Sequence, residues 1–178
     1  MKIRKAALTD APHIAKVHVD SWRTTYKDIF PQEYLNNLSY EERTSFLEKS
    51  IPQQDVYVAE NNQGEIVGFS VGGLEREGKH EGYLGELYAI YIVEEYQGNG
   101  IGKELVKPVV EQLKQVGINT MLIWVLEDND ARYFYESIGG RKIDTVEVEM
   151  AGVKVNETAY GWDDLKKQFS LEEESRDI

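Results

Sequence analysis

A cluster of three glycines, set between an apolar run and an amphipathic helix pattern, limits the possible folds more than any other part of the sequence. Glycine accepts positive φ angles, and its missing Cβ leaves the backbone amides open to a bound anion. The first N–H groups of a helix lack partners inside the helix and lie at the positive end of its dipole. The pattern therefore predicts an anion site at the start of a helix. Its residues are Gln97, Gly98, Asn99, Gly100, Ile101, Gly102 and Lys103.

Two common nucleotide-binding motifs differ from this turn. A dinucleotide-binding motif has the spacing G-x-G-x-x-G and an acidic ribose ligand further on, whereas the spacing here is G-x-G-x-G. A P-loop has four residues between its glycines and a Ser or Thr after its lysine, whereas Glu104 follows Lys103 here. Neither nucleotide-binding fold is therefore expected.

The hydrophobic periodicity predicts strands and helices in a mixed order. A mainly helical N-terminal third is followed by a hairpin, a strand, two helices separated by a strand, and a final pair of alternating strands. The expected strands are a short one at Ile3 and the ranges 56–59, 66–71, 84–93, 120–126, 143–150 and 153–162. The expected helices run from Thr9 to about Tyr26, after Pro31, after Ser39, over 101–116 and from Asp128 to Ile138.

The length and composition indicate one soluble domain. The chain has 178 residues, of which 41% are hydrophobic, and we expect a domain over residues 1–165 followed by a polar tail over 166–178. No apolar run is long enough to span a bilayer, and no secretory signal is present at the N-terminus. We therefore expect a cytoplasmic protein that has no membrane partner.

Charge and residue usage exclude further classes of function. The net charge of −12 would repel a phosphate backbone, so no nucleic-acid partner is expected. The same charge suits either a solubilising surface or a cleft that gathers cationic amines. The chain has no cysteine, which excludes disulfides and thiolate chemistry. No metal is expected either, because metal-ligand spacing is absent among His13, His18 and His80.

A second motif follows the glycine turn, and the two together resemble a known family. The second motif is N-D-A-R-Y-F-Y-E-S-I-G, which begins at Asn129 and contains Tyr135. Together with the Q-x-x-G-x-G pattern that begins at Gln97, it makes the chain resemble the GNAT superfamily of N-acetyltransferases over about residues 1–162. Two details differ from the commonest family pattern: the Asn-to-Tyr spacing is one residue shorter, and Gly140 replaces a Phe.

This resemblance implies a fold and a cosubstrate. The fold is of the α/β (α+β) class, with a mixed, mostly antiparallel central sheet flanked by helices, and the cosubstrate is acetyl-CoA. Within the glycine turn, residues 98–103 would hold the pyrophosphate of coenzyme A, and Gln97 and Asn129 would also bind the cofactor. Backbone groups of the preceding strand would pair with the pantetheine arm, at Ile90, Tyr91 and Ile92.

Acetyl transfer from a thioester to an amine needs a neutral amine, a donor to the oxyanion and a proton for the leaving thiolate. By the resemblance, Tyr135 donates this proton, and a backbone N–H near Ile90 could serve the oxyanion. Glu86, at the start of the cofactor strand, is the expected base. Two alternatives stay open: Glu86 could pair with an arginine or with water, and a relay of waters could replace a dedicated base.

The expected acceptor is a primary amine of a small molecule. By the resemblance, the N-terminal helices line the acceptor side with Trp22, Tyr26 and Tyr34, although ordinary packing would explain the same residues. Three alternatives stay open: acetylation of a protein N-terminus or lysine, a sensor that binds coenzyme A without turnover, and a structural interaction domain. The exposed edge of the final strands could also pair two chains as a homodimer.

Overall fold

The computed structural model describes residues 1–169 of the chain, and every strand and helix predicted from the periodicity is present in them. The strands are β1 (Lys2–Lys5), β2 (Val56–Glu60), β3 (Ile66–Leu74), β4 (Gly85–Ile92), β5 (Met121–Leu126), β6 (Arg141–Met150) and β7 (Val153–Trp162). The helices are α1 (Ala11–Thr25), α2 (Gln32–Asn36), α3 (Tyr40–Ser50), α4 (Ile101–Gln115), α5 (Ala131–Ser137) and α6 (Leu165–Gln168). Two short 3₁₀ turns, which the periodicity did not predict, are η1 (Leu8–Asp10) and η2 (Glu94–Tyr96).

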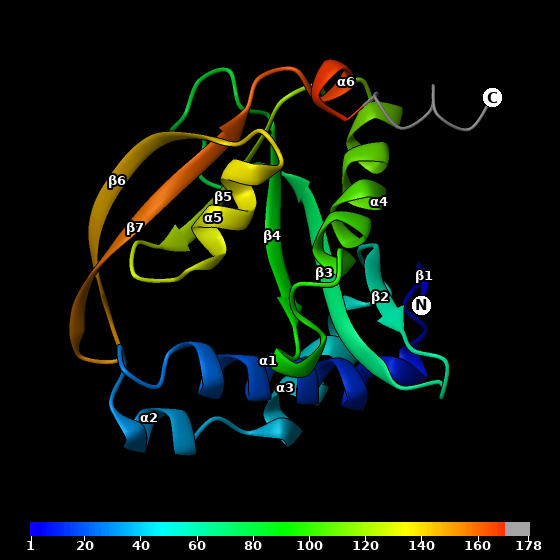
Figure 1. Ribbon diagram of the computed structural model, residues 1–178, viewed down its shortest axis with the longest axis vertical. Coiled ribbons are helices and arrows are strands. Elements are labelled where there is room, and N and C mark those ends of the chain that lie inside the picture. The colour runs from blue at the N-terminus through cyan, green and yellow to red at the C-terminus, as the bar shows by residue number, and fades with distance from the viewer. Residues whose placement is uncertain (170–178) are drawn as a thin grey trace. The chain divides into compact units, whose positions relative to one another are not determined.

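The strands form one mixed sheet in the order β1-β2-β3-β4-β5-β7-β6 (Figure 1). Strands β4 and β5 run parallel, whereas the pairs β1–β2, β2–β3 and β5–β7 run antiparallel. The register between β4 and β5 has two residue pairs, Gly85 with Met121 and Glu86 with Leu122. The expected class of fold, a mostly antiparallel sheet with flanking helices, is confirmed.

The chain forms two compact units. The first unit consists of Met1–Val71, Ala89–Val106 and Met150–Val153. The second unit consists of Gly72–Tyr88, Lys107–Glu149 and, of the described residues, 154–169. Four strands, β3, β4, β6 and β7, and the helix α4 contribute residues to both units.

The core of the first unit lies among α1, α3, β2 and β3, and Figure 1 shows α1 and α3 side by side. Apolar residues of α1 recur at helical spacing, so one face of the helix is buried against the strands. The members of this core are Ala11, Ile14, Ala15, Val17, Leu47, Val56, Val58 and Phe69.

Two polar contacts fix the ends of this unit's strands. The carboxylate of Asp10 accepts hydrogen bonds from Arg4 at 2.7 and 3.0 Å and from the N–H of Ala7 at 2.7 Å, which joins β1 to the start of α1. These bonds hold the pKa of Asp10 below its usual range, the arginine being the main cause. In the β2–β3 turn, the side chain of Asn61 donates to the hydroxyl of Tyr96 at 3.0 Å, which fixes η2 just before the glycine turn.

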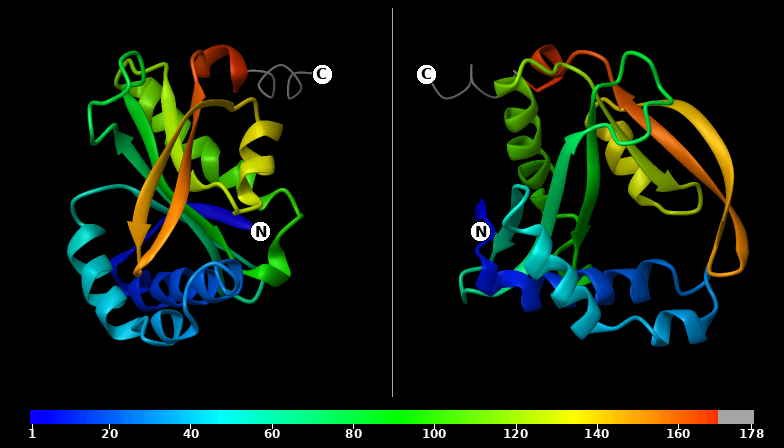
Figure 2. Two further views of the ribbon diagram at one scale, coloured as in Figure 1. Left: turned by 90° about the vertical axis from the view of Figure 1, so that its left-hand side faces the viewer. Right: turned by 180° about the vertical axis from the view of Figure 1, so that it is seen from behind.

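Strands β6 and β7, which belong to the second unit except at the residues next to their turn, form the long hairpin seen in Figure 2. Its turn, Ala151-Gly152, has φ angles of 53° and 75°, as the two-residue turns that match the twist of a hairpin require. The indole of Trp162 is completely buried and donates to the carbonyl of Ile138 at 3.0 Å. This bond fixes the end of α5 on β7.

The C-terminal region differs from the expected tail in its first residues. Helix α6 begins at Leu165 and extends through residues 166–168, which the sequence assigned to the tail. The carboxylate of Asp164 accepts from the N–H of Lys167 at 3.1 Å and from the side chain of Asn119 at 3.1 Å. The rest of the expected tail, residues 170–178, lies outside the described residues.

Candidate functional site

The glycine turn has the backbone conformation that its sequence predicts. Gly98 and Gly100 have φ angles of 76° and 79°, which residues with a Cβ rarely adopt. The turn is exposed, whereas Ile101, the first residue of α4, is 5% exposed and fixes the helix in the core. The side chain of Gln97 donates to the carbonyl of Ile92 at 2.9 Å, so the turn is tied to the end of β4.

The start of α4 can bind an anion. A Cβ built on Gly98 or Gly100 meets no atom within 4 Å, so the protein leaves open space beside these backbone groups. The helix that follows has 15 residues, and its first N–H groups have no carbonyl partners within the helix. A phosphate group placed here would accept hydrogen bonds from backbone N–H groups at the positive end of the helix.

The strand residues assigned to the pantetheine arm precede this turn at the end of β4. The hydroxyl of Tyr91 accepts a hydrogen bond from the indole N–H of Trp22 at 3.1 Å. The ring of Tyr91 lies 5.0 Å from that of His18 and 5.8 Å from that of Phe69. Burial raises the pKa of Tyr91. The side chain of this residue therefore belongs to the core of the first unit, and only its backbone could pair with a ligand.

The three aromatic residues expected on the acceptor side form part of one continuous cluster. Trp22 stacks on Phe30 at 5.9 Å and meets Tyr26 edge to face at 4.7 Å, and Phe30 lies 5.9 Å from Tyr34. Tyr26 is 5% exposed and Tyr34 is 39% exposed. These contacts favour ordinary packing for Trp22 and Tyr26, and they leave Tyr34 as the member with the most open ring.

A partly buried histidine lies beside this cluster. The ring of His18 stacks between Trp22 at 6.0 Å and Phe69 at 5.8 Å. The pKa of His18 is lowered to about 3, mainly by burial and to a smaller extent by the nearby charge of Arg43. His18 is therefore neutral at physiological pH, and its role is that of a packed aromatic ring.

In the second unit, the candidate base Glu86 is paired with an arginine. The carboxylate of Glu86 is 3% exposed and accepts from Arg76 Nη2 at 2.7 Å, from its Nε at 3.4 Å and from its backbone N–H at 3.2 Å. The guanidinium of Arg76 lies over the ring of Tyr88, with 4.2 Å from its carbon to the ring centroid. Pairing with an arginine is one of the two alternatives that the sequence left open for Glu86.

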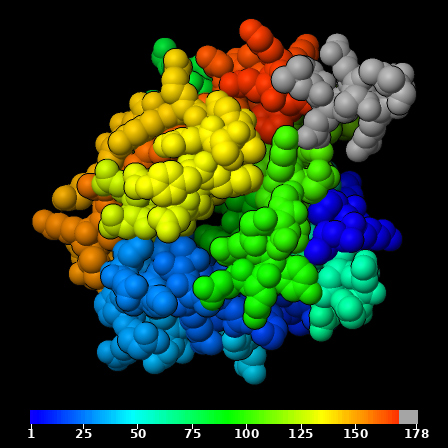
Figure 3. Space-filling model, in the orientation of Figure 1, coloured from blue at the N-terminus to red at the C-terminus, as the bar shows by residue number. Residues whose placement is uncertain are grey.

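The candidate acid Tyr135 is buried in α5, a helix that Figure 3 shows in yellow at the surface of this unit. Tyr135 is 3% exposed and its ring lies 6.3 Å from the rings of both Tyr160 and Trp162. Asn129 accepts a hydrogen bond from the N–H of Ala131 at 2.9 Å, which stabilises the first turn of α5. The side-chain oxygen of Asn129 therefore has a local structural partner.

The structure also brings together three residues that the sequence did not connect. Nε2 of His80 lies 2.9 Å from a carboxylate oxygen of Asp144, and the ring of His80 meets that of Trp124 edge to face at 5.3 Å. The three residues belong to the β3–β4 connection, β6 and β5. A separation of 64 residues between His80 and Asp144 leaves no local signal in the sequence.

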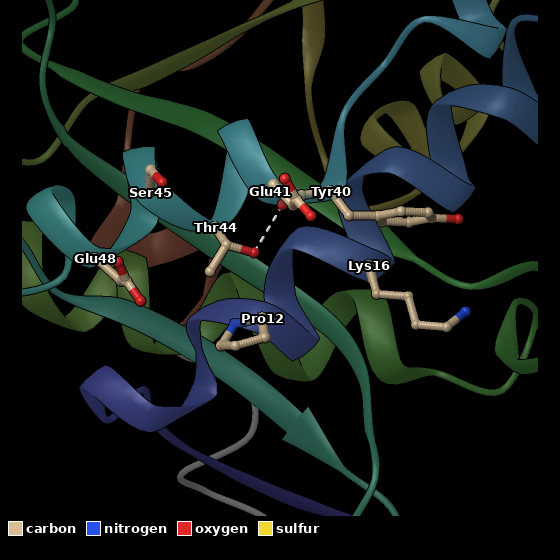
Figure 4. Close-up of a pocket in the computed structure, with 7 residues that line it drawn as sticks. All are labelled: Pro12, Lys16, Tyr40, Glu41, Thr44, Ser45 and Glu48. Carbon is tan, nitrogen blue, oxygen red and sulfur yellow. Dashed lines mark hydrogen bonds between the residues drawn. The ribbon is translucent and has the colours of Figure 1, made fainter.

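An open pocket between α1 and α3 contains none of the expected site residues (Figure 4). Within it, the hydroxyl of Thr44 donates to the carbonyl of Tyr40 at 2.7 Å, as the dashed line in the figure shows. The lining residues are Pro12, Lys16, Tyr40, Glu41, Thr44, Ser45 and Glu48. The pocket does not contribute to the candidate site.

Residues 1–169 contain neither a cluster of metal-ligating side chains nor a helix that could cross a membrane. No three histidine, aspartate or glutamate side chains in this range are grouped as they would be around a metal ion. No helix in the same range is long and apolar enough to cross a membrane.

Comparisons with known proteins agree on one family. The sequence profile described as "Acetyltransferase (GNAT) family" matches residues 18–139. The protein named "Uncharacterized N-acetyltransferase YuaI", from Bacillus subtilis, is 44% identical over 169 residues, which are 95% of this chain and 96% of that protein. A ribosomal protein bS18 alanine N-acetyltransferase of Haemophilus influenzae is 39% identical over 85 residues, which are 48% of this chain and 53% of that protein.

A solved structure shows the same fold. It is the PaiA N-acetyltransferase of Thermoplasma acidophilum in complex with coenzyme A, which matches with a TM-score of 0.67. The match covers 90% of this chain and 98% of the other, and the two sequences are 22% identical. At this identity the likeness concerns the fold alone.

Proposed function

The chain belongs to the acetyltransferase (GNAT) family, and we propose from this premise that it transfers the acetyl group of acetyl-CoA to a primary amine of a small molecule. The observation that carries the proposal is the exposed turn with two left-handed glycines at the start of a 15-residue helix. That turn offers backbone N–H groups to the pyrophosphate of coenzyme A, at residues 97–103. The backbone of Ile90, Tyr91 and Ile92 would pair with the pantetheine arm, and Asn129 would add a contact.

The proposed chemistry is direct attack. The lone pair of the amine attacks the thioester carbonyl carbon, a backbone N–H near Ile90 stabilises the oxyanion, and the C–S bond then breaks. Tyr135 gives its hydroxyl proton to the departing thiolate.

The ion pair between Arg76 and Glu86 limits which group can act as the base. Glu86 could take the proton of the ammonium group only if Arg76 turned away, because the guanidinium donates to both carboxylate oxygens. While Glu86 is paired with Arg76, a relay of waters is a better acceptor for the proton of the ammonium group than the carboxylate of Glu86. The pair would then fix the connection between β3 and β4 beside the acceptor.

A second acceptor has one specific observation in its favour. The relative from Haemophilus influenzae is named for acetylation of the alanine of a ribosomal protein, and its 39% identity extends over about half of this chain. An N-terminal alanine is also a primary amine, so the same attack on acetyl-CoA would apply. Acceptor selection would then depend on residues outside the cofactor motifs, such as Tyr34 with its 39% exposed ring.

The test is release of free thiol from acetyl-CoA across a panel of polyamines, aminoglycosides, amino acids and peptides that begin with alanine. Turnover on one small amine supports the proposal, and turnover confined to the peptides supports the second acceptor. Binding of acetyl-CoA without turnover on any of them would contradict both and favour a sensor.

The role of Tyr135 is tested with a matched pair of variants on α5. Tyr135→Phe should lower kcat by about 100-fold, the usual contribution of a general acid, and leave the affinity for acetyl-CoA within twofold. Tyr133→Phe is the control, because Tyr133 lies on the same helix with 56% of its surface exposed. Equal kcat in the two variants would remove Tyr135 from the mechanism.

A further inference from the structure

Three residues of the second unit, His80, Trp124 and Asp144, form a group that the chemistry above does not use. Nε2 of His80 lies 2.9 Å from a carboxylate oxygen of Asp144, and the rings of His80 and Trp124 meet edge to face at 5.3 Å. The side chain of His80 is only 17% exposed. A histidine held by a carboxylate at one ring nitrogen is an arrangement that orients the ring to accept a proton at the other.

The register of the sheet places the group in one row across β5, β7 and β6. Trp124 on β5 pairs with Ala159 on β7. Counted back from the two-residue turn of the hairpin, Asp144 on β6 lies opposite Ala159. The next pair along, two threonines whose hydroxyls lie 3.3 Å apart, agrees with this register. His80 contacts both ends of the row, and the small side chain of Ala159 in its middle leaves room for the imidazole ring.

This row lies on the face of the sheet that carries Glu86. Glu86 pairs with Leu122, and Leu122 and Trp124 are two residues apart on β5, so the three side chains share one face. The distance along β5 between Leu122 and Trp124 is about 7 Å, and Trp124 lies beyond the last residue pair of β4 and β5. Tyr135 packs on the opposite face, because its ring lies near that of Tyr160, the residue of β7 that follows the row. The candidate acid and His80 are therefore on different sides of the sheet, which keeps their proton transfers apart.

Two polar atoms of the group are buried and, among the residues that the structure describes, have no hydrogen-bond partner. They are Nδ1 of His80 and Nε1 of Trp124. The carboxylate of Asp144 can only accept, so Nε2 of neutral His80 carries the hydrogen and Nδ1 has a free lone pair. The indole Nε1 can only donate. One acceptor and one donor on adjoining rings match a single water molecule, which would satisfy both and keep further hydrogen bonds for a ligand.

The charged groups around His80 are mainly acidic. The hydrogen bond to His80 is the main cause that lowers the pKa of Asp144, so this carboxylate is charged. Glu157, two residues from the row on the same face of β7, has a pKa that is raised chiefly by burial and also by the charge of Glu77. Lys79 pairs with Glu77 at 3.3 Å, the arginine of the same connection pairs with its own carboxylate, and β5 has no charged residue. These carboxylates would stabilise the positive charge that the ring gains with a proton.

We propose that His80, oriented by Asp144, accepts the proton that the attacking amine must lose, through a water molecule bound between His80 and Trp124. This role rests on the proposed acetyl transfer and gives the relay of waters its end point. An ammonium group loses two protons on its way to an amide. The first passes through the water to Nδ1 of His80 and later to solvent, which frees the lone pair for attack on the thioester carbon. The second leaves the nitrogen after the C–N bond has formed, and it replaces the proton that Tyr135 gives to the thiolate.

The test is the pH dependence of kcat with an amine that the wild-type protein acetylates. The kcat of wild type should fall on the acid side of a midpoint between about pH 5 and 8, the range in which histidines titrate. His80→Gln keeps an N–H donor for Asp144 and cannot take up a proton. It should lower kcat by about 100-fold and abolish this acid limb, with KM for both substrates within about twofold of wild type. Asp144→Asn keeps an acceptor for Nε2–H without the charge, so its acid limb should move to lower pH.

Two variants at exposed positions are the controls. Glu147→Gln removes a carboxylate from the same strand as Asp144, and His13→Gln removes a histidine from α1. Both should have the pH profile of wild type. A second readout does not need turnover: the ¹⁵N NMR spectrum of neutral His80 should show the hydrogen on Nε2 and a bare Nδ1.

The results separate this role from the proposed function. Turnover by His80→Gln with the acid limb of wild type, or a hydrogen on Nδ1 of neutral His80, would refute the role of His80 and leave acetyl transfer intact. Absence of thiol release with every acceptor would contradict acetyl transfer and this role together. Circular dichroism shows whether each variant is folded, and if His80→Gln is not, an unshifted acid limb in folded Asp144→Asn would equally refute the role.

Discussion

His18 should make the protein sensitive to mild acid. Its pKa is lowered from 6.5 to about 3 in the folded chain, chiefly by burial, whereas an unfolded chain would leave it near 6.5. A depressed histidine pKa contributes stability that is present above pH 6.5 and is lost as the pH falls toward 3, because the unfolded chain then binds the proton and the folded chain does not. Between pH 7 and 5.5 this difference amounts to a loss of about 1 kcal/mol.

Urea unfolding at pH 7, 6.5, 6 and 5.5 measures this loss and stays above the isoelectric point of about 4.7. His18→Gln replaces the imidazole by an amide that does not titrate, so its stability should fall by about 1 kcal/mol less than that of wild type over the same range. His13→Gln, at an exposed position of the same helix, should lose as much as wild type. Equal pH dependence of wild type and His18→Gln would refute the assignment of a partly buried, neutral histidine, whatever the variant's stability at pH 7.

Three further substitutions test the packing and the turns by urea unfolding. Gly140→Ala should lower the free energy of unfolding by about 1–3 kcal/mol, because its Cβ would lie 2.7 Å from the carbonyl of Tyr135 and 2.8 Å from the indole of Trp162. Ala151→Gly should raise it by about 0.5–1 kcal/mol, since Ala151 has a φ of 53° that glycine adopts without strain. Asp10→Asn should lower it by about 1–2 kcal/mol through the weakened bonds to Arg4. For each variant, a midpoint of urea unfolding equal to that of wild type would contradict the structural reason given for its change in stability.

Local features of the site could be predicted because short segments determine them. The positive φ angles of Gly98 and Gly100 follow from the residue type and from the strand and helix on either side. The final hairpin could be predicted for the same reason, since alternating residues on both sides of Ala151-Gly152 allow one register. Tyr135 and Asn129 were identified from a sequence motif. Asn129 contacts Ala131, two residues along the chain, and Tyr135 contacts Trp162 within the same unit.

The surroundings of the candidate base could not be predicted with the same certainty. Arg76 and Glu86 are ten residues apart on either side of a connection whose path the periodicity does not define. The burial of Trp22 and Tyr26 in an aromatic cluster was equally open, because a helix with aromatic residues at i and i+4 can present them to a core or to a ligand. Tertiary packing decides between these alternatives, and it involves residues from distant parts of the chain, such as Tyr91 against Trp22.

Calorimetric titration of the chain with acetyl-CoA tests the central claim, that the turn before α4 binds the pyrophosphate of the cosubstrate. The wild-type protein should bind one molecule, and Gly100→Ala, which forces a Cβ onto a φ of 79°, should weaken binding at least tenfold. Gly117→Ala is the control, because Gly117 has a φ of 80° and open space at the other end of α4, and it should bind as tightly as wild type. No binding by wild type, or equal binding by Gly100→Ala and wild type, would contradict the claim.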